Sequence, residues 1–442
     1  MSMSNHPPTE RRSVRSLALL SALGLLACGG AGDDGRASAG GGGGITAGAG
    51  GTAGDAGDAM TEGEDNADAD GSGGGADNDG PDGGGIPKFD VAGGEGEAGC
   101  GGGNGTGQDF SYIWIANSPE NTISKINTIT LVEEGRYVTR ETFGNPSRTS
   151  VALSGHMAVA NRSGGITKYF AYACPDPINT SSGPGDVYPF GTDGCFAWHT
   201  PMACSSQRPI AWTPGTFNED TCTWENESVW SACYNGGTSI DAVRLDGETG
   251  AVLDTVPING INSDSYGAYG GASDSDGNFW FSQLGVGKLV RVDKQALSYE
   301  IWNMPISGYG MAVDGSDRAW ICGSGVARFN YGTQTFDTSN NTDGSAAGCM
   351  ADQTHIWLAG AANVRGINLE TMNVEFNHPV GSYIHGSSID FQGNIWGASR
   401  DTRAYRVDPA TGTVDTVDGL NSPYTYSDMT GFGLANAVGP VG

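Results

Sequence analysis

Beyond residue 108, short apolar runs alternate with polar positions, and glycine or aspartate separates one run from the next. The pattern is clearest around Asp276-Gly277, a dipeptide that is typical of a hairpin turn when β-prone residues flank it. Aromatic residues dominate the run after this turn, as expected for a buried strand. Leu289 then begins a run in which apolar and charged residues alternate. The pattern predicts four antiparallel strands: one that starts at Tyr269 and precedes the turn at 276–278, and three at 279–282, 289–293 and 299–302.

This four-stranded unit is repeated along the chain. The second predicted strand of each copy carries a tryptophan, and successive tryptophans are 40, 37 and 39 residues apart. They are Trp280, Trp320, Trp357 and Trp396. A period of about forty residues with four strands per repeat is typical of a β-propeller blade, which buries its faces only against neighbouring blades. We therefore predict an all-β fold of the propeller type.

The N-terminal part of the predicted propeller is more divergent. The first blade has three predicted strands but none in the inner position. The segment 424–431 is the candidate for that place, because a strand from the far end of the chain closes the ring and removes two exposed sheet edges. The next blades start at Arg148 and Arg208, with a cysteine-bearing insertion at about 171–207. The prediction is a seven-bladed β-propeller over 109–442.

The first 28 residues have the layout of a bacterial export signal. Arginines up to Arg15 precede an apolar run at 17–27, which is too short to span a bilayer as a helix. The run ends in Leu-Leu-Ala-Cys, a sequence that resembles a lipobox. We predict a lipoprotein signal peptide at 1–28, with lipid attached to Cys28 as the first mature residue. The alternative is ordinary signal cleavage that removes Cys28.

Glycine, alanine, aspartate and glutamate make up most of the segment 29–108. With almost no aromatic residues it cannot bury enough apolar surface to offset the entropy of ordering, so we predict a disordered linker. Much of the formal net charge of -28 belongs to it, and so acidic a chain is not expected to bind nucleic acid. The layout predicts a monomer in the cell envelope, lipid-anchored on the outer membrane or the cell surface.

The chain has nine cysteines, and eight remain when Cys28 is left out. An even number in an exported protein predicts disulfides, although the sequence alone does not determine their pairing. Cys174 with Cys195 would brace the insertion, and Cys322 with Cys349 would link neighbouring blades. The histidines are scattered and no Cys-x-x-Cys pair occurs, so the sequence identifies no metal ligands. The disulfide candidates are Cys174, Cys195, Cys204, Cys222, Cys233, Cys322 and Cys349.

The third predicted strands share a pattern of three consecutive residues, which are a basic residue, an apolar residue and then aspartate or asparagine. Since five copies of one feature do not make five catalytic sites, we interpret these residues as structural, joining strands and turns. The basic members are Lys125, Arg244, Arg291, Arg328 and Arg406.

The stretch from Asp274 to Ser282 has the pattern Asp-x-x-Gly-Asn-x-Trp-Phe-Ser, and Lys-Leu-Val-Arg-Val-Asp follows it at 288–293. It resembles the streptogramin B lyase-like propellers, which are close to the NHL-type repeats. The resemblance covers about 109–436. It implies a propeller whose relatives open a cyclic depsipeptide by elimination, with a divalent cation, a histidine and a glutamate near the channel mouth. In layout the chain also resembles anchored propeller lipoproteins of soil bacteria.

The inner strands of a propeller line its central channel, and their N-terminal ends form one rim, the channel mouth. At this rim the prediction places seven residues, one per blade, of which six are aromatic or basic. Arginine binds carboxylate or phosphate through paired hydrogen bonds, and tyrosine offers a flat face to sugar rings or peptide side chains. We therefore predict a ligand site here, the alternative being that these side chains only plug the channel. The six residues are Arg148, Arg208, Tyr269, Tyr309, His385 and Tyr426.

The residues that a lyase needs are incomplete at this rim. His385 belongs to it, no glutamate does, and Asp428 is the nearest acid in sequence. Elimination requires a base, an acid and a group that holds an enolate-like charge. We therefore expect a small molecule, glycan, peptide or partner to bind at the mouth without catalysis and without a cofactor. The alternatives are a lyase that uses His385, Asp428 and Mg²⁺ or Ca²⁺, and a cell-surface scaffold for protein interactions.

Overall fold

The predicted signal peptide, the lipidation site Cys28 and the predicted linker 29–108 lie outside the residues that the structure describes. The structure is a computed structural model, and its described residues all fall within the C-terminal unit of the chain, Gly80–Gly442. They are 112–235, 239–261, 266–340 and 346–439.

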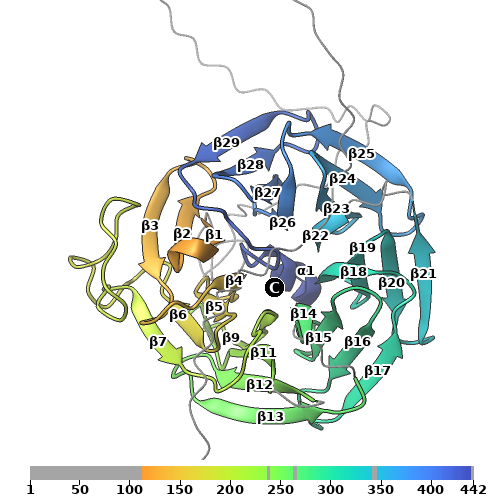
Figure 1. Ribbon diagram of the computed structural model, residues 1–442, viewed down its shortest axis with the longest axis horizontal. Helices are drawn as coiled ribbons and strands as arrows, with labels where there is room; N and C mark the ends of the chain where they lie inside the picture. The colour runs from red at the N-terminus through yellow and green to blue at the C-terminus, as the bar shows by residue number, and fades with distance from the viewer. Residues whose placement is uncertain (1–111, 236–238, 262–265, 341–345, 440–442) are drawn as a thin grey trace, which may run out of the picture. The chain divides into compact units, whose positions relative to one another are not determined.

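Seven β-sheets surround a central channel, which confirms the predicted seven-bladed β-propeller (Figure 1). Six of the sheets have four antiparallel strands, and the first has three. In each blade the strands follow one another in chain order from the channel outwards.

Blades one to three show the most variation. A two-stranded hairpin of β9 (Thr216–Asn218) and β10 (Thr223–Glu225) interrupts blade three, and the 3-10 helix η1 (Ser118–Glu120) joins the first two strands of blade one. The strands are β1 (Tyr112–Asn117), β2 (Thr122–Asn127) and β3 (Glu133–Val138) in blade one; β4 (Pro146–Val151), β5 (Met157–Asn161), β6 (Ile166–Tyr169) and β7 (Phe196–Thr200) in blade two; and β8 (Ile210–Thr213), β11 (Ser228–Tyr234), β12 (Ile240–Asp246) and β13 (Val252–Ile258) in blade three.

Blades four to seven repeat one regular unit. Blade four has β14 (Ala268–Ser273), β15 (Phe279–Gln283), β16 (Lys288–Val292) and β17 (Tyr299–Asn303), and blade five has β18 (Gly308–Val313), β19 (Ala319–Gly323), β20 (Val326–Asn330) and β21 (Thr335–Ser339). Blade six has β22 (Ala346–Ala351), β23 (His355–Gly360), β24 (Asn363–Asn368) and β25 (Val374–Pro379), and blade seven has β26 (Ile384–Ile389), β27 (Ile395–Ser399), β28 (Arg403–Val407) and β29 (Val414–Asp418).

Apolar side chains of facing sheets form the core between blades. In blade four, Phe279 pairs with Val292 and Phe281 with Val290 across β15 and β16. The Phe279 ring lies 5.7 Å from the ring of Trp230 in blade three, and the two planes are nearly parallel at 5°. Because no blade buries these faces by itself, the sheets are stable only as a ring.

A repeated hydrogen bond between tryptophan and aspartate organises blades four to seven. The indole Nε1 donates to the carboxylate of an aspartate five or six residues earlier, over 2.6–2.9 Å. The same carboxylates accept backbone N–H groups of the turn between the first two strands. The tryptophans whose spacing along the chain predicted the blades are therefore the donors of this repeated hydrogen bond. The pairs are Trp280 with Asp274, Trp320 with Asp314, Trp357 with Asp352 and Trp396 with Asp390.

The basic residues that recur in the third predicted strands make structural contacts, and three of the five join neighbouring blades. Three of them donate to a backbone carbonyl of the next blade, over 2.5–2.6 Å. The other two, Arg244 and Arg291, pair with carboxylates of their own blades. The bonds between blades run from Lys125 to Ala171, from Arg328 to Leu369 and from Arg406 to Thr128.

The C-terminal segment 420–431, called the tail below, fills the inner position of blade one, which confirms the predicted closure of the ring. The Tyr424 N–H donates to the carbonyl of Ala116, and the Trp114 N–H donates to the carbonyl of Met429, both over 2.9 Å. The tail thus lies beside β1, between the first and last blades (Figure 1).

The tail is not a regular strand. Its two anchors are five residues apart, whereas their partners on β1 are two residues apart. The residues between the anchors bend towards blade two, where the Val151 N–H donates to the carbonyl of Asp428 over 3.1 Å. The Ser427 hydroxyl donates to the carbonyl of Thr149 in the same strand, β4. The hydrogen bonds of the tail therefore reach blade two as well as blade one.

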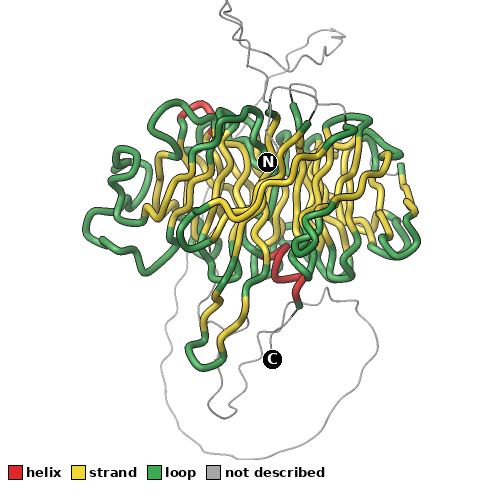
Figure 2. The backbone as a smooth tube through the Cα atoms, turned by 90° about the horizontal axis from the view of Figure 1, so that it is seen from below, coloured by secondary structure: helices red, strands yellow, loops and turns green. Residues whose placement is uncertain are grey.

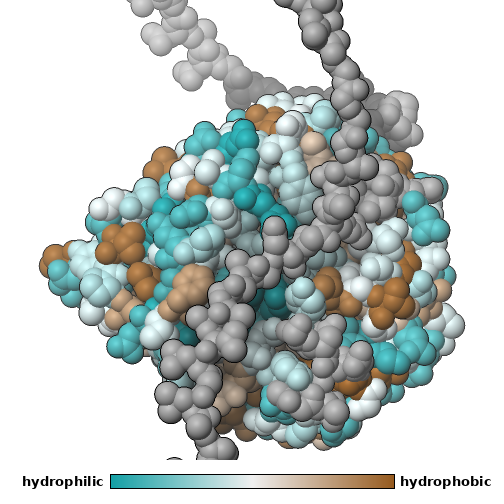
Figure 3. Space-filling view, in the orientation of Figure 1, coloured by the Kyte–Doolittle hydropathy of each residue, from teal (hydrophilic) through white to brown (hydrophobic). Residues whose placement is uncertain are grey.

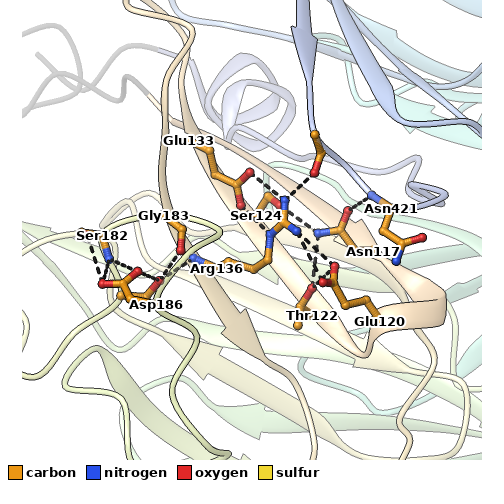
Figure 4. A network of polar contacts seen from close by, with 12 residues as sticks. Asn117, Glu120, Thr122, Ser124, Glu133, Arg136, Ser182, Gly183, Asp186 and Asn421 are labelled. Atoms are coloured by element: carbon orange, nitrogen blue, oxygen red, sulfur yellow. Dashed lines mark hydrogen bonds and ion pairs between the residues drawn. The ribbon is translucent and has the colours of Figure 1, made fainter.

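Arg136 of β3 joins blade one to the connection that leads out of blade seven (Figure 4). Its guanidinium donates to the carbonyl of Gly419 over 2.8 Å and pairs with Glu133 at 2.8 Å. Close by, the Asn421 N–H donates to the side chain of Asn117 over 2.9 Å. These contacts hold the start of the tail against the first blade.

A short helix, α1 (Phe432–Val438), follows the tail and was not predicted. The Asp428 carboxylate accepts the N–H groups of Gly431, Gly433 and Leu434 at its N-terminus, over 2.8–3.1 Å. The helix contacts the inner strands β14, β18, β22 and β26, and Figure 2 shows it beyond the strand ends on one face. A cavity of about 30 Å³ remains between α1 and the inner strands, space for about one or two waters. The helix thus closes one end of the channel.

The segment predicted as an insertion, 171–207, contains β7, the outer strand of blade two. The loop before β7 projects beyond the ring next to β3 (Figure 1). The Ser181 hydroxyl accepts the N–H of Arg136 in β3 over 2.9 Å, so the loop covers part of the outer edge of blade one.

All seven cysteines that were predicted as candidates form disulfides. The Cys174–Cys195 bond braces the loop of blade two, and Cys322–Cys349 links blades five and six, as expected. The remaining candidates are Cys204, which pairs with Cys233, and Cys222, which is disulfide-bonded too. Disulfides persist in oxidising compartments, which supports an extracellular or periplasmic location. Among the described residues, none of the helices has the length and apolar character to cross a bilayer.

The aspartate–tryptophan bond makes a prediction for stability. Asp390 is fully buried, and Asp390→Ala leaves the Trp396 indole and the turn amides without an acceptor. We expect a loss of about 2–4 kcal/mol in the free energy of unfolding, measured with urea. Asp390→Asn keeps an acceptor oxygen and should lose less. The control is Asp337→Ala, whose carboxylate is 53% exposed; equal losses in Asp390→Ala and the control would contradict the role.

Asp428 makes a prediction for pH dependence. Burial raises the pKa of its carboxyl to about 6, although the amides of α1 oppose this shift. Because this pKa exceeds that of the unfolded chain, about 3.9, the stabilising effect of protonation is complete at low pH and is lost as the pH rises through about 6. The difference in unfolding free energy between wild type and Asp428→Asn should therefore shift by about 1–3 kcal/mol against the wild type between about pH 4 and 7. A constant difference would contradict this assignment.

Candidate functional site

The six residues predicted for the channel mouth do lie together. They occupy the end of the channel opposite α1, whose Asn436 reaches the carbonyl of Ala351 at the C-terminal end of β22. Figure 3 shows hydrophilic residues around the centre of the ring on the face turned to the viewer. Arg148, Tyr269, Tyr309 and His385 lie near the starts of β4, β14, β18 and β26, Arg208 precedes β8, and Tyr426 belongs to the tail.

Arg148 lies between tyrosine rings at the centre of the mouth. Its guanidinium carbon is 3.5 Å from the ring centroid of Tyr426 and 4.7 Å from that of Tyr269. The side chain is completely buried, and its Nη1 donates to the Ser147 hydroxyl over 2.6 Å. Its Nε and Nη2 have no hydrogen-bond partner within the described part of the chain. Burial in these surroundings lowers the pKa of Arg148 to about 9.

A chain of hydrogen bonds runs across the tyrosines and the histidine. The Tyr309 hydroxyl lies 2.6 Å from His385 Nε2 and 2.6 Å from the hydroxyl of Tyr424. The Tyr424 hydroxyl lies 2.8 Å from that of Tyr269. At the other end, His385 Nδ1 lies 2.8 Å from the hydroxyl of Tyr383. Both ring nitrogens of His385 are therefore engaged.

Three further arginines lie over the same tyrosines. Arg208 is 4.9 Å from the ring centroid of Tyr269, and Arg162 and Arg400 are 4.1 and 5.5 Å from that of Tyr424. Cation–π contacts of this kind stabilise a guanidinium without neutralising it. The mouth is thus cationic, although the whole chain has a formal net charge of -28.

These charges shift the pKa values of the neighbouring side chains. Burial, reinforced by Arg400, Arg148 and Arg162, holds the pKa of His385 well below its ordinary value, so its imidazole is neutral near pH 7. Burial opposes ionisation of Tyr424, but Arg148, Arg162 and the hydroxyls of Tyr269 and Tyr309 outweigh it and lower the pKa of Tyr424.

Sequence reasoning missed Arg162, Arg400, Tyr424 and Tyr383. The first two belong to the loops after β5 and β27, which return the chain to the rim where the inner strands begin. The signal was present, because every loop between the second and third strands of a blade ends at that rim. Arg162 and Arg400 lie outside the inner strands, whose N-terminal ends define the predicted rim.

The structure does not bring His385 and Asp428 together. Asp428 caps α1 and lines the small cavity beneath the inner strands, whereas His385 belongs to the channel mouth. Among the described residues, no three histidine, cysteine or acidic side chains are grouped as metal ligands. The described residues therefore do not fit the divalent cation that the lyase resemblance implies.

Comparisons with known proteins support the fold. Searches of family models and of curated proteins found no match to this chain. Among solved structures, a streptogramin B lyase is 12% identical, with 64% of this chain and 86% of that chain covered and a TM-score of 0.47. A functionally unknown protein from Desulfotomaculum acetoxidans is 9% identical over 71% and 96%, with a TM-score of 0.50. A dihydro-heme d1 dehydrogenase is 11% identical over 75% and 76%, with a TM-score of 0.47. At these identities the likeness concerns the fold alone.

Proposed function

We propose that this protein binds a ligand at the channel mouth without transforming it. The observation that carries the proposal is Arg148, a completely buried guanidinium with two nitrogens that lack acceptors among the described residues. A buried charge without partners is costly, and natural proteins rarely keep one without a purpose. A ligand with acceptor oxygens would satisfy both nitrogens.

The side chains around Arg148 favour a ligand with an anionic group and a flat or cyclic body. The guanidinium fork matches the two oxygens of a carboxylate or phosphate. The rings of Tyr426, Tyr269 and Tyr309 pack together beside this guanidinium, and aromatic rings suit contact with a sugar ring or a peptide side chain. A small molecule, an acidic glycan or a peptide therefore suits the site.

The absence of catalysis is part of the proposal. The lyase alternative requires a base that can accept a proton and an acid for the leaving oxygen. Tyr309 and Tyr383 occupy both ring nitrogens of His385, and Asp428 serves the N-terminus of α1.

A second cavity, of about 530 Å³, lies between blades two and three beneath the β9–β10 hairpin. Two of its charged side chains, Lys168 and Glu227, already have partners. Lys168 donates to the carbonyl of Gly247, and Glu227 accepts the N–H of Ser154. The channel mouth, with its unsatisfied guanidinium, is therefore the better candidate.

Binding at the mouth is tested by calorimetry on the full chain with glucuronic acid, which combines a carboxylate with a sugar ring. We expect saturable binding that Arg208→Ala weakens about ten- to hundredfold, because a charge-assisted hydrogen bond is lost. Lys288→Ala, whose ammonium bonds to Asn303 of its own blade, is the matched control. A loss of affinity of the same size in the control, or turnover of the glucuronic acid, would contradict the proposal.

We further propose that the protein is an exported, monomeric lipoprotein anchored through Cys28, on the outer membrane or the cell surface. The disulfides of the propeller support export, because they form in oxidising compartments. Cys28→Ser should move the protein from the membrane to the soluble fraction of the producing cells. Unchanged membrane association of the variant would contradict the anchor.

A further inference from the structure

Among the residues that the structure describes, the channel mouth holds four cations and no carboxylate that pairs with them. Every ion pair found in the described part of the chain involves other residues. Four guanidinium groups that share one set of tyrosine rings repel one another, and an anion would relieve this repulsion. The four are Arg148, Arg162, Arg208 and Arg400.

Tyr424 is the group at the mouth that can supply a negative charge. Its ring lies beneath Arg162 and Arg400, and its hydroxyl meets the hydroxyls of Tyr309 and Tyr269 at 2.6 and 2.8 Å. Two phenol O–H groups that donate to one oxygen stabilise that oxygen as a phenolate. Tyr424 is 7% exposed, so water contributes little to this stabilisation.

The hydrogen-bond chain connects this buried oxygen to the surface. From Tyr424 it passes through Tyr309 and His385 to Tyr383, over 2.6, 2.6 and 2.8 Å. The side chain of Tyr383 is 42% exposed. A proton can therefore exchange between solvent and Tyr424 while the Tyr424 ring stays buried.

We propose that the channel mouth binds an oxyanion together with one proton, the oxyanion on the guanidinium groups of Arg148 and Arg208 and the proton on the phenol oxygen of Tyr424. This inference rests on the proposed function and names the ligand chemistry. Without the anion, the Tyr424 phenolate offsets part of the arginine charge. When the anion binds, it takes over that role, and a solvent proton forms the O–H bond of Tyr424. No bond of the anion is broken.

The groups that face Tyr424 agree with this coupling. Arg148 comes from β4, Arg162 and Arg400 from two loops, Tyr269 from β14, Tyr309 from β18 and His385 from β26. Among these described groups none is a carboxylate, so the cations and the neighbouring hydroxyls lower the pKa of Tyr424 although burial opposes it. The pKa of His385 lies so low that its imidazole stays neutral when the anion binds.

The test uses the full chain with sulfate and acetate, because neither anion takes up a proton between about pH 7 and 9. Sulfate represents a tetrahedral group such as phosphate, and acetate represents a carboxylate. The near-ultraviolet absorbance of tyrosinate is followed as each anion is added. This readout excludes Arg148, the second group that titrates near this range, because a guanidinium does not absorb there.

We expect the tyrosinate absorbance to fall by an amount that corresponds to up to about one tyrosinate per bound anion. The affinity for the anion should weaken by up to about tenfold per pH unit as the pH rises above the pKa of Tyr424. Tyr424→Phe should still bind the anion near pH 7 but lose the absorbance change. Tyr331→Phe, at a partly exposed tyrosine of blade five, is the matched control and should behave as wild type.

Two outcomes overturn this inference and leave the proposed function in place. In the first, an anion binds with no loss of tyrosinate, or with the same loss in Tyr424→Phe. In the second, neither anion binds, although glucuronic acid does so in a manner that depends on Arg208. If nothing binds at the mouth, the proposed function fails as well.

Discussion

The hydrogen bond from a buried indole to an aspartate carboxylate is the interaction on which the regular blades depend. A carboxylate is costly to bury unless donors surround it, and burial does raise the pKa of Asp274 and Asp390. The indole and the turn amides supply those donors, so turn, second strand and carboxylate stabilise one another. In blade three the indoles of Trp212 and Trp230 donate instead to carbonyls of the neighbouring blades. The ring is thus held by polar bonds that an apolar core alone would not specify.

This arrangement separates the structural end of the channel from the mouth. The aspartate turns follow the C-terminal ends of the inner strands, where α1 and its cap at Asp428 also lie. Within the described ranges, the N-terminal ends carry no such repeated bond. Arg148, Tyr309 and His385 occupy them and interact mainly with one another and with the tail. The side chains of the mouth are therefore not required to close the blades.

The mouth is also the point where the acidic chain concentrates positive charge. Shielding by tyrosine rings allows guanidinium groups to lie close together, because each cation meets the negative face of a ring. The tail brings two of these rings, Tyr424 and Tyr426, so closure of the ring and assembly of the site are one event. A change that loosens the tail is expected to affect both.

The sequence by itself determined the blade repeat, the closing segment, the cysteines that form disulfides and six residues of the mouth. These features depend on residues at fixed spacings along the chain. The alternation of a strand, or a bond such as that of Trp396 to Asp390, recurs wherever the local sequence pattern recurs. Only the tertiary structure decided that Arg162, Arg400 and Tyr424 join the mouth, that Asp428 lies away from His385, and that α1 closes the other end. Such contacts join residues from distant blades, and their distances depend on the curvature of the whole ring, which no local pattern records.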